Sequence, residues 1–289
     1  MQLAGRIYYW QLKKYNMLER EPQPIRQGEV QPEQKEVKKD GLEILKGDIR
    51  ERFLELREEG VPVDERLRIN INEFGGVYSK DFIESCRKYV KDLKAYFKAK
   101  AMSGSKSSWA FPKKEVLKET PMGEIFEMLK TSIFQEKLGK DFIVTRTSEY
   151  DDLKNNVDNI ILERETGNIV CAFDEVGADS GEIFEEKKEE VSKKNLEGKG
   201  ADLAYGIFFE KKAGKMELKK GKIEHMPIFY LSMSEEEIKN NLDNPERREE
   251  SFYSFIDSIK KQIKELKEHQ LHSKLKERLD SFEKVIEKL

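Results

Sequence analysis

The residues of this sequence whose types and spacing best suit a reactive or metal-binding site are three acids, Asp158, Asp174 and Glu175. Asp158 lies near the start of the apolar run VDNIILE. Asp174 and Glu175 end the run NIVCAFDE, which follows after the short turn ERETG. If the two runs pair as an antiparallel hairpin, the start of the first lies beside the end of the second. We therefore expect the three carboxylates to gather at one end of a sheet.

A shared divalent ion is the chemistry that such a group of carboxylates favours. Close carboxylates repel one another unless they share a proton or a cation, and hard oxygen ligands suit Mg²⁺ or Mn²⁺. An ion at this place could polarise a phosphodiester and lower the pKa of an attacking water. The alternative is that the acids only cap turns. Asp151 and Asp152, in the nearby segment SEYDDLKNN, belong either to an outer part of the acidic site or to a solvated loop.

The segments around these acids predict the elements that must position them. Apolar residues at helical spacing indicate helices, and alternating or short apolar runs between turn residues indicate strands. The pattern predicts a helix over residues 122–138, strands over 142–147, 157–163 and 168–175, a helix over 182–195, and strands over 203–210 and 227–232. We expect a mixed α+β fold in which helices flank a central mixed β-sheet.

Element order and acid placement together resemble the PD-(D/E)XK nuclease superfamily, whose core is helix, strands and helix. Its members have one Asp early in a strand and an acidic-x-Lys motif on the next strand. The matching residues here are VD at Val157 and Asp158, and DEV from Asp174 to Val176. The resemblance covers roughly residues 122–232. It implies a restriction-endonuclease-like core and a Mg²⁺-dependent nuclease that acts on DNA or RNA.

Val176 occupies the position of the motif lysine. In the superfamily that lysine orients or activates the water, and a lysine from the next helix sometimes replaces it. Lys187 and Lys188 are the candidates here, and the alternative for both is a lysine that snorkels on a solvated helix. An acid of the preceding helix, Glu124 or Glu127, could add the extra ligand that many members have. The absent motif lysine leaves open a non-catalytic relative that binds nucleic acid or a protein.

Contact with nucleic acid would need a local basic patch, because the whole chain is not basic. Lysine and arginine number 54 against 57 acids, which gives a formal net charge of −3. The densest local patch is the segment KKAGKMELKKGK on a predicted hairpin. Its lysines are Lys211, Lys212, Lys215, Lys219, Lys220 and Lys222. They either follow a phosphate backbone or protect an exposed sheet edge from aggregation.

Helical regions precede and follow the predicted core in the sequence. The predicted divisions are an N-terminal segment with a linker over 1–41, a helical region over 42–108 that ends in the hinge MSGSKSS, a nuclease-like core over 109–233 and a helical region over 234–289. The first helical region contains helices over 42–59 and 79–101.

The last region carries two apolar seams that are out of phase, which predicts a bend near His269. These helices either form a hairpin on their own chain or a coiled coil between two copies, which would make a homodimer.

Several classes of protein do not fit the sequence. No apolar run approaches the ~18 residues of a membrane-spanning helix, and residues 1–15 lack the pattern of a signal peptide. Cys86 and Cys171 are isolated, which predicts buried reduced thiols and a cytoplasmic location. The three histidines lack cysteine partners at zinc spacing, and no glycine-rich phosphate loop is present.

Overall fold

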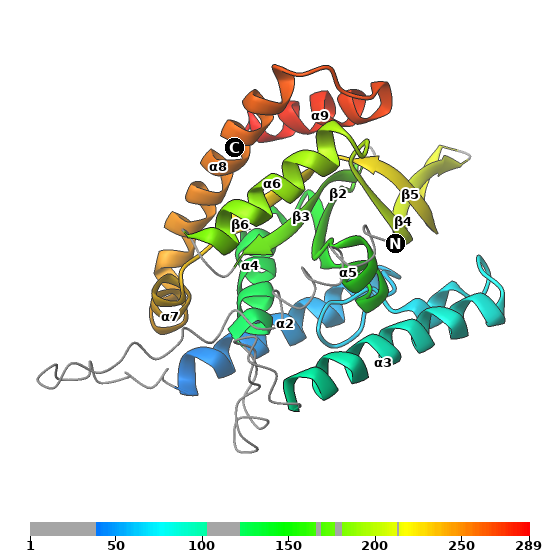
Figure 1. The fold of residues 1–289 in the computed structure, drawn as a ribbon, viewed down its shortest axis with the longest axis horizontal. Coiled ribbons are helices and arrows are strands. Elements are labelled where there is room, and N and C mark those ends of the chain that lie inside the picture. Colours follow the sequence, from blue (N-terminus) through cyan, green and yellow to red (C-terminus); the bar gives the residue numbers. More distant parts are fainter. Residues whose placement is uncertain (1–38, 103–121, 166–168, 177–180, 213) are drawn as a thin grey trace, which may run out of the picture.

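The computed structural model of the 289-residue chain describes residues 39–102, 122–165, 169–176, 181–212 and 214–289. These residues form a mixed α+β fold with a four-stranded mixed sheet and a separate two-stranded sheet (Figure 1). The helices are α2 (Lys39–Glu58), α3 (Lys80–Met102), α4 (Met122–Leu138), α5 (Glu149–Asn155), α6 (Glu182–Leu196), α7 (Glu235–Asp243), α8 (Arg248–Lys267) and α9 (Ser273–Ile286), with short 3-10 helices η1 (Ile71–Phe74) and η3 (Pro245–Arg247). The strands are β1 (Phe142–Arg146), β2 (Asn159–Glu163), β3 (Ile169–Val176), β4 (Ala201–Lys212), β5 (Lys215–Met226) and β6 (Ile228–Ser232).

The central sheet has the strand order β1-β2-β3-β6. The first three strands pair antiparallel, and β6 joins β3 in parallel. Parallel pairing needs a long crossover, which here contains α6 and the β4–β5 hairpin. Every residue of β1 is buried, including the polar Thr145 and the charged Arg146 at its end, so this strand is covered on both faces.

Helices cover both faces of this sheet. Successive strand residues point to opposite faces. Phe229 of β6 packs against α9, whereas the next residue, Tyr230, packs against α6. Phe134 of α4 stacks on Phe173 of β3 with ring centroids 5.2 Å apart, and Phe173 is the register partner of Phe229. Thus α4 and α9 share one face, and α6 covers the other.

A segment from the N-terminal part extends the sheet beyond β1. The N–H of Ile69 donates to the carbonyl of Arg146 at 3.0 Å, and the N–H of Arg146 donates to the carbonyl of Leu67 at 2.9 Å. The same region is part of the main core, because buried side chains from Leu45 in α2 to Ile286 in α9 form one hydrophobic cluster. The segment places Arg68 beside Arg146 at the end of β1.

The structure confirms the mixed α+β fold and most of the predicted elements. The helix predicted over 122–138 is α4, with the same bounds, and the two acidic strands are β2 and β3. The predicted linker and hinge fall almost wholly in residues 1–38 and 103–121, outside the described residues. Cys86 is a buried free thiol, as predicted.

One of the two interpretations of the segment SEYDDLKNN was wrong, and a second segment forms a sheet that the sequence did not specify. Residues 149–155 form helix α5, not a solvated loop, because the Ser148 side chain caps the helix by accepting from the N–H of Asp151. The strand predicted over 203–210 is present, and the sequence had not assigned it to a sheet. It is part of β4, which pairs only with β5 over the described residues.

The C-terminal region is a helical hairpin that packs on its own chain. α8 contacts α4 and β6, while α9 contacts β3 and β5. The seam residues that suggested a coiled coil are buried there, among them Ile256, Ile259, Ile263, Leu266, Leu275, Phe282 and Ile286. This part of the chain therefore uses its apolar seams internally. Among the described helices, none is long and apolar enough to cross a membrane.

Candidate functional site

The end of β1, the start of β2 and the end of β3 lie side by side at one end of the central sheet. The N–H of Asp158 donates to the carbonyl of Phe173 at 2.8 Å, and its own carbonyl accepts from Thr147 at 2.8 Å. The backbone thus brings residue 158 beside residues 173 and 174. Asp158 is fully buried. The side chains of Asp174 and Glu175 lie outside what the structure describes.

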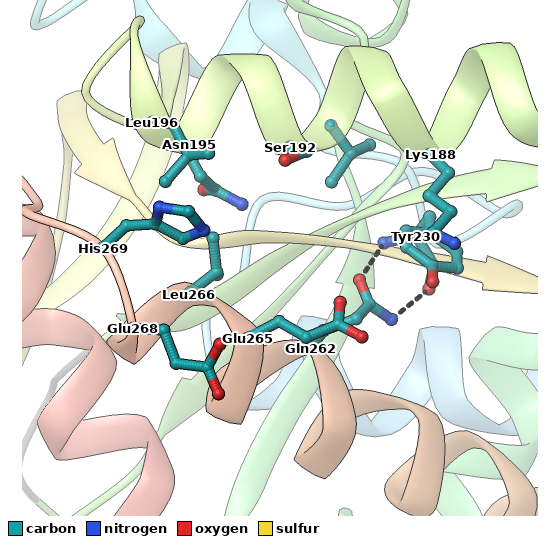
Figure 2. A pocket seen from close by; sticks show the side chains of 11 residues that line it. Lys188, Ser192, Asn195, Leu196, Tyr230, Gln262, Glu265, Leu266, Glu268 and His269 are labelled. Carbon is teal, nitrogen blue, oxygen red and sulfur yellow. Dashed lines mark hydrogen bonds between the residues drawn. The ribbon is translucent and has the colours of Figure 1, made fainter.

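The two candidate lysines of α6 lie in different surroundings. Lys187 is only 3% exposed, and its helix packs against β3 and β6. The side chain of Lys188 is 42% exposed and lies 3.9 Å from the carboxylate of Glu185. Figure 2 shows Lys188 at the rim of a pocket between α6 and α8, near Tyr230. Only Lys187 is held in the interior, where a charged group needs an anionic or hydrogen-bonding partner.

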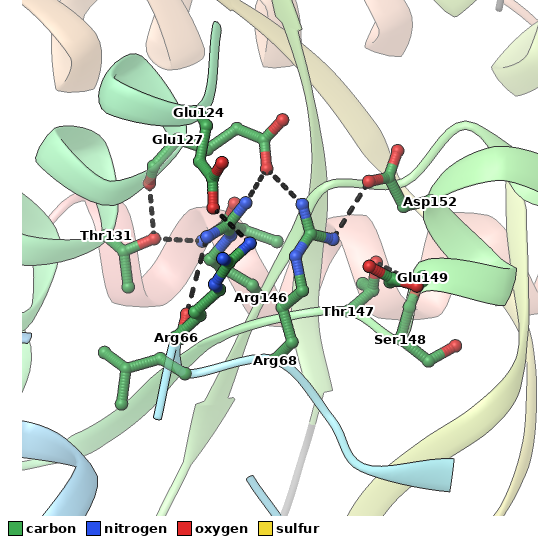
Figure 3. A network of polar contacts seen from close by, with 12 residues as sticks. Arg66, Arg68, Glu124, Glu127, Thr131, Arg146, Thr147, Ser148, Glu149 and Asp152 are labelled. Atoms are coloured by element: carbon green, nitrogen blue, oxygen red, sulfur yellow. Dashed lines mark hydrogen bonds and ion pairs between the residues drawn. The ribbon is translucent and has the colours of Figure 1, made fainter. Parts of the chain in front are cut away.

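A buried network of two arginines and two acids occupies the same end of the sheet (Figure 3). We call it the arginine–carboxylate network, and its members are Arg68, Arg146, Glu127 and Asp152. The Glu127 carboxylate accepts from Arg68 at 2.6 Å and from Arg146. Arg68 also donates to Asp152 at 2.9 Å. The network ties α4, β1, α5 and the segment at residue 68 together.

Glu124 and Glu127, the two acids of α4 that the sequence suggests as an extra metal ligand, both bind arginines. Two guanidinium groups bind one oxygen of Glu127, so a divalent ion at that oxygen would compete with both. Glu124, nearer the surface, accepts from Arg66 at 2.8 Å. The sequence interpretation missed Arg68 and Arg146. The available signal for Arg146 was a charged residue at the end of a strand, FIVTR, that begins with three apolar residues.

Further polar groups are buried on the same α4 face. Lys130 is fully buried one turn after Glu127, and its ammonium lies 5.4 Å from the centre of the Phe173 ring. The Thr131 hydroxyl donates to the Glu127 carbonyl at 2.6 Å and accepts from Asn159 at 2.7 Å. Charged side chains are almost never fully buried in a protein core unless they are paired, so this concentration of buried charge is unusual.

Asp151 anchors β4 to α5. Its carboxylate accepts from the backbone N–H groups of Ala204 at 2.7 Å and Tyr205 at 3.0 Å, and from the side chains of Ser148 and Asn155. Burial raises the pKa of Asp151, while the four hydrogen bonds act in the opposite direction. Asp151 is therefore a buried structural group rather than a solvated one, and Asp152 belongs to the arginine–carboxylate network.

The lysines of the β4–β5 hairpin divide into two groups. Lys219 pairs with Glu217 at 2.7 Å, and Lys222 pairs with Glu224 at 2.5 Å. Lys220 donates to the backbone carbonyl of Glu73 at 2.9 Å. The three lysines nearest the tip, Lys211, Lys212 and Lys215, are exposed and form no ion pair with the described residues. Only the tip of the hairpin keeps its positive charge unpaired.

No group of three or more histidine, cysteine, aspartate or glutamate side chains that could hold a metal ion occurs among the described residues. Comparisons of the chain with protein-family models, with curated proteins and with solved structures gave no match.

Proposed function

We propose that this protein is a metal-dependent phosphodiesterase of the PD-(D/E)XK type that acts on DNA or RNA. The observation that carries the proposal is the backbone contact between Asp158 and Phe173 of β3, because Asp174 and Glu175 follow Phe173 directly in that strand. The order α4, β1, β2, β3, α6 and β6 supports it, with α5 inserted between β1 and β2 and the β4–β5 hairpin inserted before β6. The isolated cysteines favour a cytoplasmic location for this activity.

The donor set fits a hard divalent ion. Asp158, Asp174 and Glu175 would hold Mg²⁺ or Mn²⁺ through carboxylate oxygens. The bound ion would polarise the phosphodiester and make a water more acidic. Val176 occupies the position of the motif lysine, and Lys187 supplies the lysine instead. Of the two α6 candidates, Lys187 is the buried one. Its role is to orient the attacking water.

Two observations favour a second candidate function, a non-catalytic relative that binds nucleic acid or a protein. Val176 removes the motif lysine, and Asp158 is fully buried, whereas a catalytic ion needs an open position for water. In this alternative the same end of the sheet serves stability and binding only.

Cleavage of labelled DNA and RNA in Mg²⁺ or Mn²⁺ separates the two functions. The wild type is expected to cleave, and both Asp174→Asn and chelation of the metal should abolish cleavage. Lys187→Met should lower the rate roughly 100-fold or more, while Lys188→Met, the matched control on the same helix, keeps it. Thermal unfolding of each variant verifies that it folds. Equal cleavage rates for the wild type and Asp174→Asn would contradict the catalytic assignment.

A further inference from the structure

A pocket of about 530 Å³ opens between α3, α5 and the segment that precedes η1. Four cationic side chains line it, Arg68, Arg87, Lys91 and Lys94, against two acids, Asp64 and Glu149. Asp64 is already used in its own turn, because it accepts the backbone N–H groups of Arg66 and Arg68. Counted over the lining side chains alone, four cations against two acids give the pocket wall a formal charge of +2 (4 − 2).

Three of these cations form one stripe along α3. Arg87, Lys91 and Lys94 are spaced four and three residues apart, which places them on the same helix face. They span roughly 10 Å along the helix axis at 1.5 Å per residue. Lys94 pairs with Glu149 at 2.7 Å, and Arg87 contacts Glu84 and Asn72. Lys91 is exposed and has no ion pair with the described residues.

Apart from Asn70, the rest of the wall is aromatic and aliphatic. Tyr150 lines the pocket together with Ile69, Ile71 and Val90. Burial and the neighbouring Cys86 raise the pKa of Tyr150 to about 12, so its ring is neutral at ordinary pH and does not repel an anion. Cations beside a ring that can stack are the usual means of binding a single nucleic-acid strand. A volume in the range of about 300–1,000 Å³ suits one nucleotide unit rather than a duplex.

The pocket also leads toward the acidic end of the sheet. Arg68 lines the pocket and belongs to the arginine–carboxylate network. Residue 68 pairs with Arg146, Arg146 with Asn159, and Asn159 with Phe173. Neighbouring strands lie about 4.8 Å apart, so three steps place the end of β3 roughly 15 Å from the pocket edge. A strand of a few nucleotides covers that distance.

We infer that this pocket binds a single strand of DNA or RNA, with phosphates on Arg87, Lys91 and Lys94 and a base stacked on Tyr150. Its direction toward Asp158 rests on the proposed function. Binding in the pocket does not depend on cleavage, so the two can fail separately.

Fluorescence polarisation of labelled strands, measured in EDTA, tests the inference without cleavage. The probes are a DNA strand and an RNA strand of about 12 nucleotides, near the upper site sizes of single-strand binding folds, and the matching duplex. Lys91→Glu is expected to weaken single-strand binding about tenfold at ~0.1 M salt. It should also reduce the slope of log affinity against log salt concentration by about the value of one phosphate contact. Lys260→Glu, an equal charge change on the distant helix α8, should leave both unchanged (Figure 1).

Substitutions of the ring complete the test. Tyr150→Leu should weaken binding about fivefold or more, whereas Tyr150→Phe keeps the ring and the affinity. A wild type that binds no strand, a Lys91→Glu variant that binds like the wild type, or a duplex bound as tightly as the single strand would each overturn the inference. If single strands bind in this way but Mg²⁺ produces no cleavage, the pocket stands and the catalytic proposal fails.

Discussion

Glu127 holds two arginines at once in a buried part of the molecule. Arg68 and Arg146 share its carboxylate, and Arg68 continues to Asp152. Removing one member of such a buried group leaves the others without compensation, which costs about 3–5 kcal/mol in known cases. The network joins three elements at the sheet end where Asp158 lies. Its stability and the geometry of that end are therefore linked.

Replacing Glu127 by Gln should destabilise the protein by about 3–5 kcal/mol, because the buried Arg146 and the part-buried Arg68 lose their shared anion. The loss should be the same in EDTA and in Mg²⁺, since the carboxylate binds arginines rather than an ion. Urea unfolding in both buffers measures it. Glu124→Gln, which breaks the exposed pair with Arg66, is the control and should cost at most about 1 kcal/mol. A loss that appears only in Mg²⁺ would make Glu127 a metal ligand after all.

Asp151→Asn should change how stability depends on pH. Burial raises the folded-state pKa of Asp151 above the ordinary value of 3.8. The stabilisation by this group is therefore complete below pH 3.8 and is lost as the pH rises through the folded-state pKa. The variant lacks this titration. At acidic pH its free energy of unfolding should be about 1–3 kcal/mol lower, because the Asn side-chain NH₂ group faces the backbone N–H donors of Ala204 and Tyr205.

The unfolding free energies of wild type and Asp151→Asn, followed from about pH 3 to pH 8, should consequently converge as the pH rises. Parallel curves for the wild type and Asp151→Asn would show that folding does not shift the pKa of the Asp151 carboxyl.

At the scale of elements, α2 crosses α7 so closely that a side chain does not fit. A Cβ at Gly41 would lie 2.4 Å from the backbone carbonyl oxygen of Leu242, whereas a Cβ at Gly47 would meet nothing within 4 Å. Gly41→Ala should therefore destabilise the protein by about 1–3 kcal/mol. Gly47→Ala on the same helix should stabilise it by about 0.5–1 kcal/mol. Thermal unfolding of the two variants gives the signs, and a stabilised Gly41→Ala would mean that α2 does not dock on α7.

A single side chain of α8 binds backbone groups on the free edge of the outer strand β6. The amide of Gln262 accepts from the N–H of Tyr230 at 3.1 Å and donates to its carbonyl at 2.9 Å (Figure 2). This side chain imitates a neighbouring strand at one residue. On the other edge, the segment from Leu67 to Ile69 bonds to the end of β1. Both edges of the central sheet are thus partly covered, which hinders the addition of a strand from another molecule.

For the whole molecule, local patterns were sufficient to predict the central elements. The apolar face of α4 and the short apolar runs of β2 and β3 need only the two periods of helix and strand. The docking of the β4–β5 hairpin on α5 was not predictable, because it involves Asp151 binding the backbone at residue 204. That contact joins positions far apart in the sequence, and the local pattern of an acidic segment indicates solvent instead.

The same limit applies to the candidate site. Antiparallel pairing was enough to predict that residue 158 lies beside residue 174. The burial of Lys130, Arg146 and Glu127 was not predicted, because a charge in isolation is assigned to the surface and its partner is distant in the chain. The sequence could not show which of Lys187 and Lys188 is buried. The two are adjacent residues of α6, and only the packing of that helix against β3 and β6 distinguishes them.

The internal use of the C-terminal seams predicts a monomer. α8 and α9 bury their apolar residues against the sheet and α4, so the coiled coil that the sequence allowed has no free seam in this region. Sedimentation velocity should give a single species of monomer mass across a hundredfold range of concentration, about 1–100 μM, and the melting temperature should not depend on concentration. Leu279→Asn should lower the melting temperature at every concentration, because Leu279 is fully buried and a Leu→Ala change at such sites already costs about 2–5 kcal/mol. A dimer that Leu279→Asn converts into a monomer with an unchanged melting temperature would instead place this seam between two copies of the chain.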